Sequence, residues 1–257
     1  MTDAGKVVSV FTRELAVEAS GRHLTRVAVP FALAGVLLAG LAFGPAPSVL
    51  QVVAPGLPWL VVLLLAAPLS LTVAVAERED GCWDLLRSLA GPGPLLWGKL
   101  AAMWVWLTAT WAVAAGLSII VLGAGMALSS VPAAALGTLG LSSAVVVYGT
   151  TAAAAGRTGT GLLTALVLPA GLPALVAGTQ ASTPGVDAPP WLLLLLAYDL
   201  AALAVAWAVF PTLLEERPCA SDPPPSWVPP LRRLVPPQPC SASSSPLLMW
   251  CRGSRNG

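Results

Sequence analysis

Six apolar runs make up most of this sequence, and its basic residues are confined to every second connection between them. The runs cover residues 27–43, 57–76, 100–126, 131–155, 161–178 and 191–214. All thirteen Lys and Arg residues lie before the first run, between the second and third, between the fourth and fifth, or after the sixth. Lys and Arg beside spanning helices stay on the cytoplasmic side. The pattern therefore predicts an all-α polytopic protein of the cytoplasmic (inner) membrane, with six transmembrane helices and both termini inside.

The composition supports a membrane protein and excludes several other classes. Hydrophobic residues make up 56% of the chain and charged residues only 10%, whereas soluble proteins average roughly 25% charged residues. A formal net charge of +1 provides no basic field for nucleic acid. The four cysteines form no C-x-x-C pair, and there is a single histidine, His23. We therefore expect no catalytic residues, no metal site and no covalently attached cofactor.

The chain divides into three parts. Residues 1–26 form a cytoplasmic interfacial segment, in which Val8, Phe11, Leu15 and Ala19 share one helical face. Its acidic residues and its length are unlike a signal peptide, so the first run is expected to remain as an anchor. Residues 27–214 form the six-helix transmembrane domain, where small residues such as Gly116 predict close helix packing. Residues 215–257 are rich in Pro and Ser and predict a disordered cytoplasmic tail.

A short amphipathic helix is predicted over residues 77–90, between the second and third runs. Its apolar positions follow the i, i+3, i+4, i+7 spacing of one helical face: Cys82, Leu85, Leu86 and Leu89. Acidic side chains occupy its other faces: Glu79, Asp80 and Asp84. Two interpretations stay open from this pattern alone. The leucine stripe either docks on a partner protein or rests on lipid and on the helices of its own chain.

Polar and aromatic residues within the spans are the remaining candidates for function. Trp104 and Trp111 share a face of the third run, where they would either line a path for a planar apolar substrate or pack against neighbouring helices. Asp199 lies deep in the sixth run, where an acid is costly. It would either belong to a substrate path or close a hydrogen-bonded helix contact.

No nucleotide site is predicted in this chain. Residues 93–99 fit the spacing G-x-x-x-x-G-K, but Leu100 follows in place of Ser or Thr, and Pro94 lacks a backbone N–H. Lys99 is instead expected to extend toward the membrane interface at the start of the third run. Any work driven by ATP therefore requires a separate subunit.

Three local patterns, taken together, resemble one known family. They are VAPGLPW at residues 53–59, EDGCWDL at 79–85 and VLPAGLPALVAG at 167–178. In this order they resemble the haem exporter protein B family (CcmB), the permease subunit of the cytochrome c maturation ABC transporter, over residues 10–214. Cys82, Trp83 and Pro58 depart from the usual family residues, and the proline-rich tail is foreign to the family.

The resemblance implies an ABC-2-type permease bundle that is not itself an enzyme. It implies three partners: a cytoplasmic ABC ATPase subunit, a haem-handling membrane protein and a second copy of this chain. Haem would be the transported or handled ligand, and ATP would act only through the ATPase. The residues expected to couple to the ATPase are Glu79, Asp80, Gly81, Asp84, Leu85, Leu86 and Leu89. Two alternatives remain: a non-transporting scaffold for haem-transfer partners, and an exporter of another hydrophobic substrate.

Overall fold

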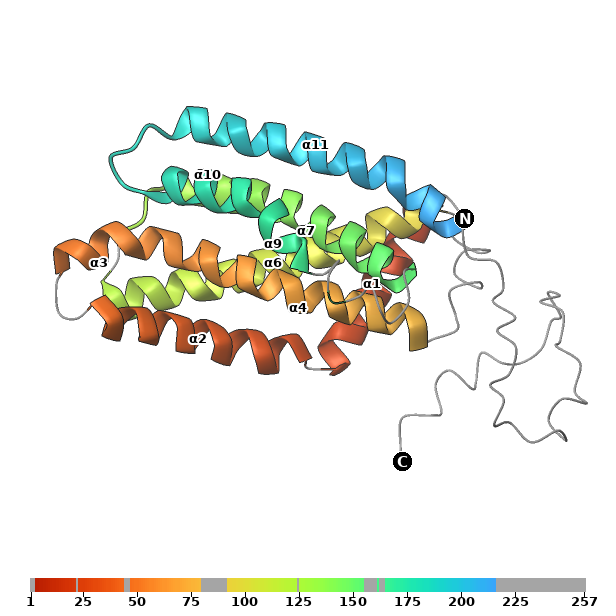
Figure 1. Cartoon of the computed structure of the whole chain (residues 1–257), viewed down its shortest axis with the longest axis horizontal. Coiled ribbons are helices and arrows are strands. Elements are labelled where there is room, and N and C mark those ends of the chain that lie inside the picture. The colour runs from red at the N-terminus through yellow and green to blue at the C-terminus, as the bar shows by residue number, and fades with distance from the viewer. Residues whose placement is uncertain are drawn as a thin grey trace, which may run out of the picture. The chain divides into compact units, whose positions relative to one another are not determined.

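Helices account for nearly all of the structure that can be described. The computed structural model describes residues 3–21, 23–43, 47–79, 92–123, 125–154, 161 and 165–215, and these residues include no strand. The elements are α1 (Asp3–Gly21), α2 (His23–Phe43), α3 (Pro47–Val53), the 3-10 turn η1 (Ala54–Gly56), α4 (Leu57–Glu79), α6 (Pro92–Leu122), α7 (Ser130–Ala154), α9 (Val167–Ala170), α10 (Leu172–Ser182) and α11 (Ala188–Glu215) (Figure 1). The all-α prediction is confirmed for this part of the chain. The predicted tail lies outside it, apart from Glu215.

Four of these helices are long and apolar enough to cross a membrane. The stretches are Ser48–Ser70, Pro92–Leu122, Ser130–Ala152 and Ala188–Thr212. A shorter apolar stretch, Pro30–Ala42, lies within α2. About 20 apolar residues cross a hydrocarbon core of ~30 Å, so these lengths fit a multi-pass membrane protein.

The third run begins and ends earlier than the sequence predicts. Its helix, α6, starts at Pro92 rather than residue 100, because proline is well tolerated in the first turn of a helix. The helix stops after Leu122 because Gly123 adopts a φ of 64°, a left-handed conformation that ends helices. The lysine expected at the start of this helix, Lys99, therefore lies two turns inside it.

The fifth run does not form one continuous helix. It is divided at Gly171 into α9 and α10. Pro173 has no N–H to donate to the carbonyl of Pro169, so the regular ladder is broken there. A Cβ at Gly171 would come closer than 3.0 Å to Leu63 of α4 and Leu141 of α7. The broken helix therefore fits closely between two neighbours, which the apolar pattern alone did not indicate.

Hydrogen bonds gather three connections at one end of the bundle, which we call the η1 end. The Ala127 N–H, in the loop between α6 and α7, donates to the carbonyl of Ser182 at the end of α10 (3.1 Å). The Ser129 hydroxyl donates to the carbonyl of Ala181 (2.6 Å). Trp59, in the first turn of α4, donates to the Ser182 hydroxyl (3.1 Å). The starts of α4 and α7 and the end of α10 therefore lie together.

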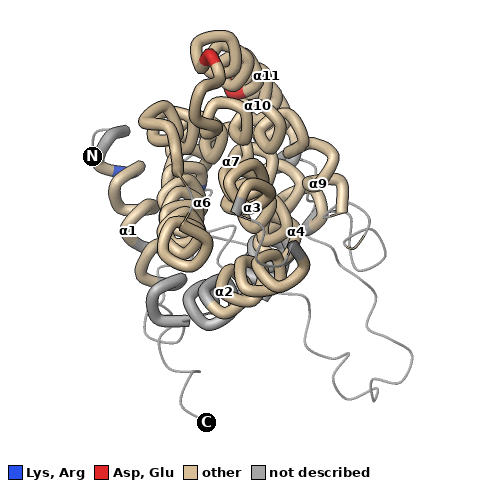
Figure 2. The backbone as a smooth tube through the Cα atoms, turned by 90° about the vertical axis from the view of Figure 1, so that its left-hand side faces the viewer, with Lys and Arg blue, Asp and Glu red and all other residues tan. Residues whose placement is uncertain are grey.

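Two helices run in opposite senses relative to the η1 end. The 25 residues of α7 carry the chain roughly 37 Å away from that end. α10 ends at the η1 end, so it leads back toward it. Figure 2 views the molecule from the side on which α3 lies. Few charged residues are coloured in this view: acidic ones on or beside α11, and a basic one on α1.

Candidate functional site

The predicted ATPase-coupling segment cannot be placed. Glu79 is the last residue of α4 in the structure. The remaining coupling candidates, which lie outside the described residues, are Asp80, Gly81, Asp84, Leu85, Leu86 and Leu89. Only the two helices that flank this segment, α4 and α6, are seen. Its helical form and its docking role therefore stay predictions.

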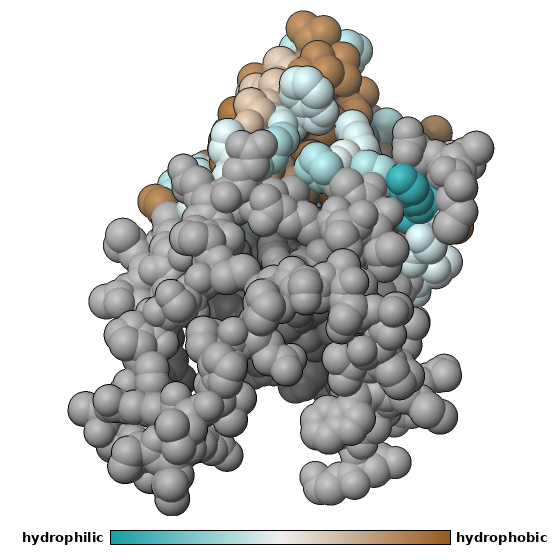
Figure 3. Space-filling view, turned by 90° about the vertical axis from the view of Figure 1, so that its right-hand side faces the viewer, coloured by the Kyte–Doolittle hydropathy of each residue, from teal (hydrophilic) through white to brown (hydrophobic). Residues whose placement is uncertain are grey.

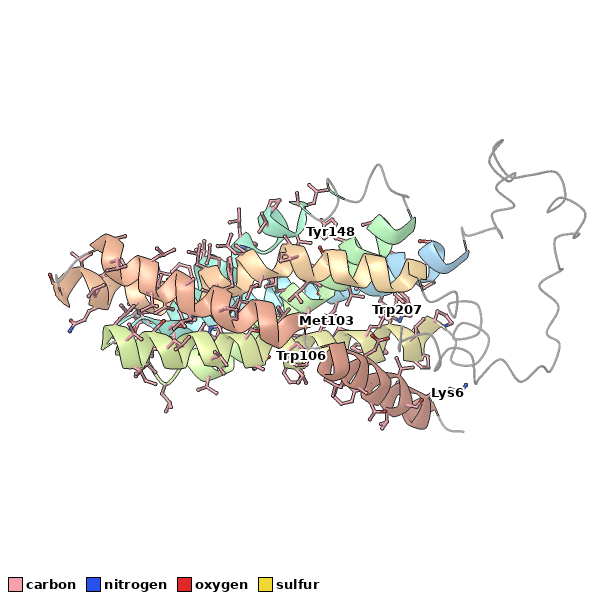
Figure 4. All side chains as sticks on the ribbon, turned by 90° about the horizontal axis from the view of Figure 1, so that it is seen from below. Lys6, Met103, Trp106, Tyr148 and Trp207 are labelled. Carbon is pink, nitrogen blue, oxygen red and sulfur yellow. The ribbon has the colours of Figure 1, made fainter. Side chains whose placement is uncertain are left out.

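The N-terminal helix α1 packs on the first turns of α6. Val10 is 4% exposed, and a Cβ added at Gly98 would come closer than 3.0 Å to its side chain. One turn later, Glu14 forms an ion pair with Lys99 (Oε1–Nζ 3.5 Å), and their side chains are only 19% and 10% exposed. Figure 4 shows α1 alongside this part of α6, with Lys6 near the free end of α1.

This contact corrects the predicted role of Lys99 and extends that of α1. Lys99 does not reach freely toward the interface, because α1 covers it and supplies a carboxylate. The helix indicated by the apolar face of Val8, Phe11, Leu15 and Ala19 is present as α1, but the residue that docks is Val10, which lies about 200° around the helix from Val8. Val8 itself is 58% exposed. Of the predicted face, Val8 is thus turned away from α6, whereas Phe11 and Leu15 are partly buried.

Trp104 and Trp111 are used in packing between helices. The Trp104 indole donates from Nε1 to the carbonyl of Ala135 on α7 (2.9 Å). Trp111 is 7% exposed, and its ring centroid lies 5.9 Å from that of Trp59, with the planes tilted by 59°. Of the two interpretations of this face, the structure favours packing.

Trp59 fills a space made by two glycines, which the sequence analysis did not identify as a site. It is 2% exposed. A Cβ at Gly178 of α10, or at Gly137 of α7, would come closer than 3.0 Å to its ring atoms. With its bond to Ser182, this indole ties α4 to α7 and α10. The one sign of this contact in the sequence is that Trp59 is followed, in later apolar runs, by the glycines Gly137 and Gly178 among other small residues.

Asp199 lies between α11 and α7. It is 2% exposed, and a Cβ at Gly140 would overlap both its carboxylate and the ring of Tyr198. Among the described residues, neither Asp199 oxygen nor the Tyr198 hydroxyl has a hydrogen-bond partner. The hydrogen-bonded contact that was one interpretation of Asp199 is therefore not seen here, although the acid does sit in a helix contact.

The structure does not bring Asp199 and Trp104 into one path. On α7, the Trp104 acceptor Ala135 and the Asp199 neighbour Gly140 are five residues apart, about 140° around the helix. The body of α7 thus stands between them. Within the part of the chain that the structure covers, no three His, Cys, Asp or Glu side chains gather as a metal set. Chemically, this arrangement holds helices together around one unpaired acid.

Comparison with known families agrees with the patterns in the sequence. No curated protein matches the chain. The model of the CcmB protein family matches residues 5–215, from the first turn of α1 to the last residue of α11. The match thus covers every helix described above. The chain belongs to the CcmB family.

Proposed function

We propose that this chain is the permease subunit of an ABC transporter that exports or delivers haem for cytochrome c maturation, with energy supplied by a separate ATPase subunit. The observation that carries the proposal is the CcmB match over residues 5–215. Membership of that family makes the chain a membrane component of a haem export system rather than an enzyme. Haem is then its substrate or handled ligand, and ATP acts only through the partner.

The proposed topology has six crossings with both termini in the cytoplasm. The return of the chain between α7 and α10 supports a fifth crossing by the broken helix. The sequences joined at the η1 end contain no Lys or Arg over residues 44–56, 123–130 and 179–190. Basic residues occur at the opposite end, as at Arg78 near the end of α4. Retention of basic residues in the cytoplasm then places the η1 end outside and the segment between α4 and α6 inside.

That cytoplasmic segment is the proposed contact for the ATPase. Its acidic residues and leucine stripe would form a helix that docks on the partner and transmits its movement to α4 and α6. The packing of α1 on α6 supports this role indirectly, because it braces the helix that follows the segment. Two copies of the chain, a haem-handling membrane protein and the inner membrane complete the proposal.

Copurification with an ABC ATPase subunit of cytochrome c maturation tests the docking role. The double variant Asp80→Asn, Asp84→Asn should lose most of the bound ATPase at unchanged membrane content. The matched control is Asp187→Asn, which neutralises an exposed acid in the turn before α11, at the η1 end. It should retain the ATPase. Equal retention by both variants would contradict docking through this segment.

A non-transporting scaffold is the second candidate, and the tryptophans favour it to a limited extent. Trp104 is bonded to α7 and Trp111 lies against Trp59, which are contacts expected of residues that pack helices together. The two functions differ in what the ATPase requires. In reconstituted vesicles, a permease predicts ATPase activity that depends on this chain and falls in the Asp80→Asn, Asp84→Asn variant. A scaffold predicts the same ATPase activity with and without the chain.

A further inference from the structure

α11 is attached to the bundle along one narrow stripe of side chains. We call this stripe the α11 seam; its buried residues are Leu195, Asp199, Ala206 and Phe210. Their spacings of four, seven and four residues place them on one helical face. The other faces are exposed and apolar, as at Trp207, which is 67% exposed. Figure 3 shows the apolar side chains that gather over α11.

The seam contains an acid, Asp199, beside which the described residues place no basic side chain. Asp199 is 2% exposed, and its carboxylate lies against the backbone of Gly140 on α7. In the described part of the chain, both carboxylate oxygens lack hydrogen-bond partners. The titratable groups near it are Tyr198 on its own helix and Tyr148 on α7, which interacts electrostatically with Tyr198. Neither tyrosine side chain carries a positive charge that could pair with the carboxylate.

A neutral carboxyl and an ionised one differ greatly in this position. An ionised Asp at the centre of a spanning helix is disfavoured by roughly two orders of magnitude relative to the same group in water. The other seam residues, Leu195, Ala206 and Phe210, hold the seam by apolar packing, and such packing between helices in lipid gains little energy to offset that cost. Closure of the seam therefore requires the protonated form of Asp199.

We propose that Asp199 is a proton-binding site, and that the α11 seam is closed when Asp199 is protonated and loosened when it is ionised. On loosening, the carboxyl gives its proton to water and the carboxylate becomes hydrated. On closure it takes a proton back. Low pH favours the protonated carboxyl and therefore the closed seam, and rising pH favours the ionised carboxyl and the open seam. α11 is then a movable wall of the bundle, and this inference does not depend on the ATPase partner.

Cysteine labelling of the purified full-length chain in detergent tests the proposal. The four native cysteines are first replaced by serine: Cys82, Cys219, Cys240 and Cys251. Ala206→Cys places a small thiol within the seam, and Ala208→Cys places one on an exposed face of α11 as the matched control. The ratio of their maleimide labelling rates cancels the ordinary effect of pH on thiol reactivity.

The ratio should rise about tenfold or more between about pH 5 and about pH 9 in the native background. With Asp199→Asn, which imitates the protonated carboxyl, it should stay at its low-pH value throughout. A constant ratio in the native background would overturn the proposal, and so would an equal rise in the Asp199→Asn background. If that variant fails to fold, Tyr198→Phe and Tyr148→Phe serve instead. If the labelling ratio no longer rose with pH in one of these two variants, the tyrosine rather than Asp199 would be the group that titrates, and the role of Asp199 would be refuted.

Discussion

Trp59 packs tightly on Gly178, whereas Gly116 has open space beside it. A glycine-to-alanine substitution should therefore have opposite effects on stability at these two positions. At Gly178, in α10, an added Cβ would come closer than 3.0 Å to three atoms of the Trp59 ring. At Gly116, in α6, an added Cβ would meet no atom within 4 Å. Gly178→Ala should therefore destabilise the chain, and Gly116→Ala should not.

The expected magnitudes follow from two terms. Replacing glycine by alanine in a helix gains about 1 kcal/mol at either site. Forcing an extra carbon into a filled space costs about 1–3 kcal/mol, because the indole is held by its bond to Ser182 and cannot move away freely. The two variants should thus differ by about 1–3 kcal/mol, which corresponds to about 2–4 °C in Tm for each kcal/mol.

The assay is thermal unfolding of the purified variants in one detergent, followed by the loss of monodisperse protein. Trp59→Phe provides a second check, because a smaller ring makes room for the added carbon. The loss caused by Gly178→Ala should therefore be smaller when Trp59→Phe is also present. Equal Tm values for the two alanine variants would refute the packing of Trp59 on Gly178.

Two further predictions concern α6. Glu14→Lys and Lys99→Glu should each lower the Tm by the equivalent of about 1–3 kcal/mol, since each sets two like charges side by side in a largely covered contact. The double swap should restore most of the loss. Additive losses in the double variant would contradict the ion pair. Trp104→Phe should lose about 1 kcal/mol with its bond to Ala135, while Trp97→Phe, at a position 46% exposed, should unfold like the native chain. A transport defect in Trp104→Phe at normal stability and protein level would instead restore the substrate-path interpretation.

The apolar runs predicted the long helices because lipid imposes a strong rule. Backbone groups in a membrane must be paired internally, so a run of about 20 apolar residues has little choice but to form a helix. The runs 57–76 and 191–214 accordingly lie within α4 and α11, and the run 131–155 matches α7 up to Ala154, the last residue of that helix. Boundaries set by other forces were missed. The early start of α6, for example, brings the polar residue Lys99 inside the helix. Lys99 can lie there because α1 covers it and supplies the carboxylate of Glu14.

Residues that join helices were harder to predict than the helices themselves. Trp59 was noted only as part of a family pattern, because its partners Gly178 and Gly137 lie in two later runs. Val10 does not belong to the regular apolar face of α1, so the apolar spacing of the sequence does not indicate that it docks on α6. Asp199 was identified because a buried acid stands out in an apolar run, but its neighbour Gly140 could not be named from the sequence. Periodicity reports which residues share a face and not what that face meets.

Shape, rather than apolar character, decides which faces meet in this bundle. Apolar side chains gain little by leaving lipid for another apolar helix, so specific contacts depend on close packing. Gly116 was expected to provide such a contact, and this was wrong, because its surroundings are open. Among the described glycines, those that do are Gly98, Gly137, Gly140, Gly171 and Gly178, each in close contact with a side chain from another helix. At Gly140 alone that side chain includes a carboxylate. Among the described glycine contacts, the contact of α7 with α11 at Gly140 is thus the one whose fit depends on a proton. It is also the contact that holds α11, the helix with the fewest other contacts to the bundle.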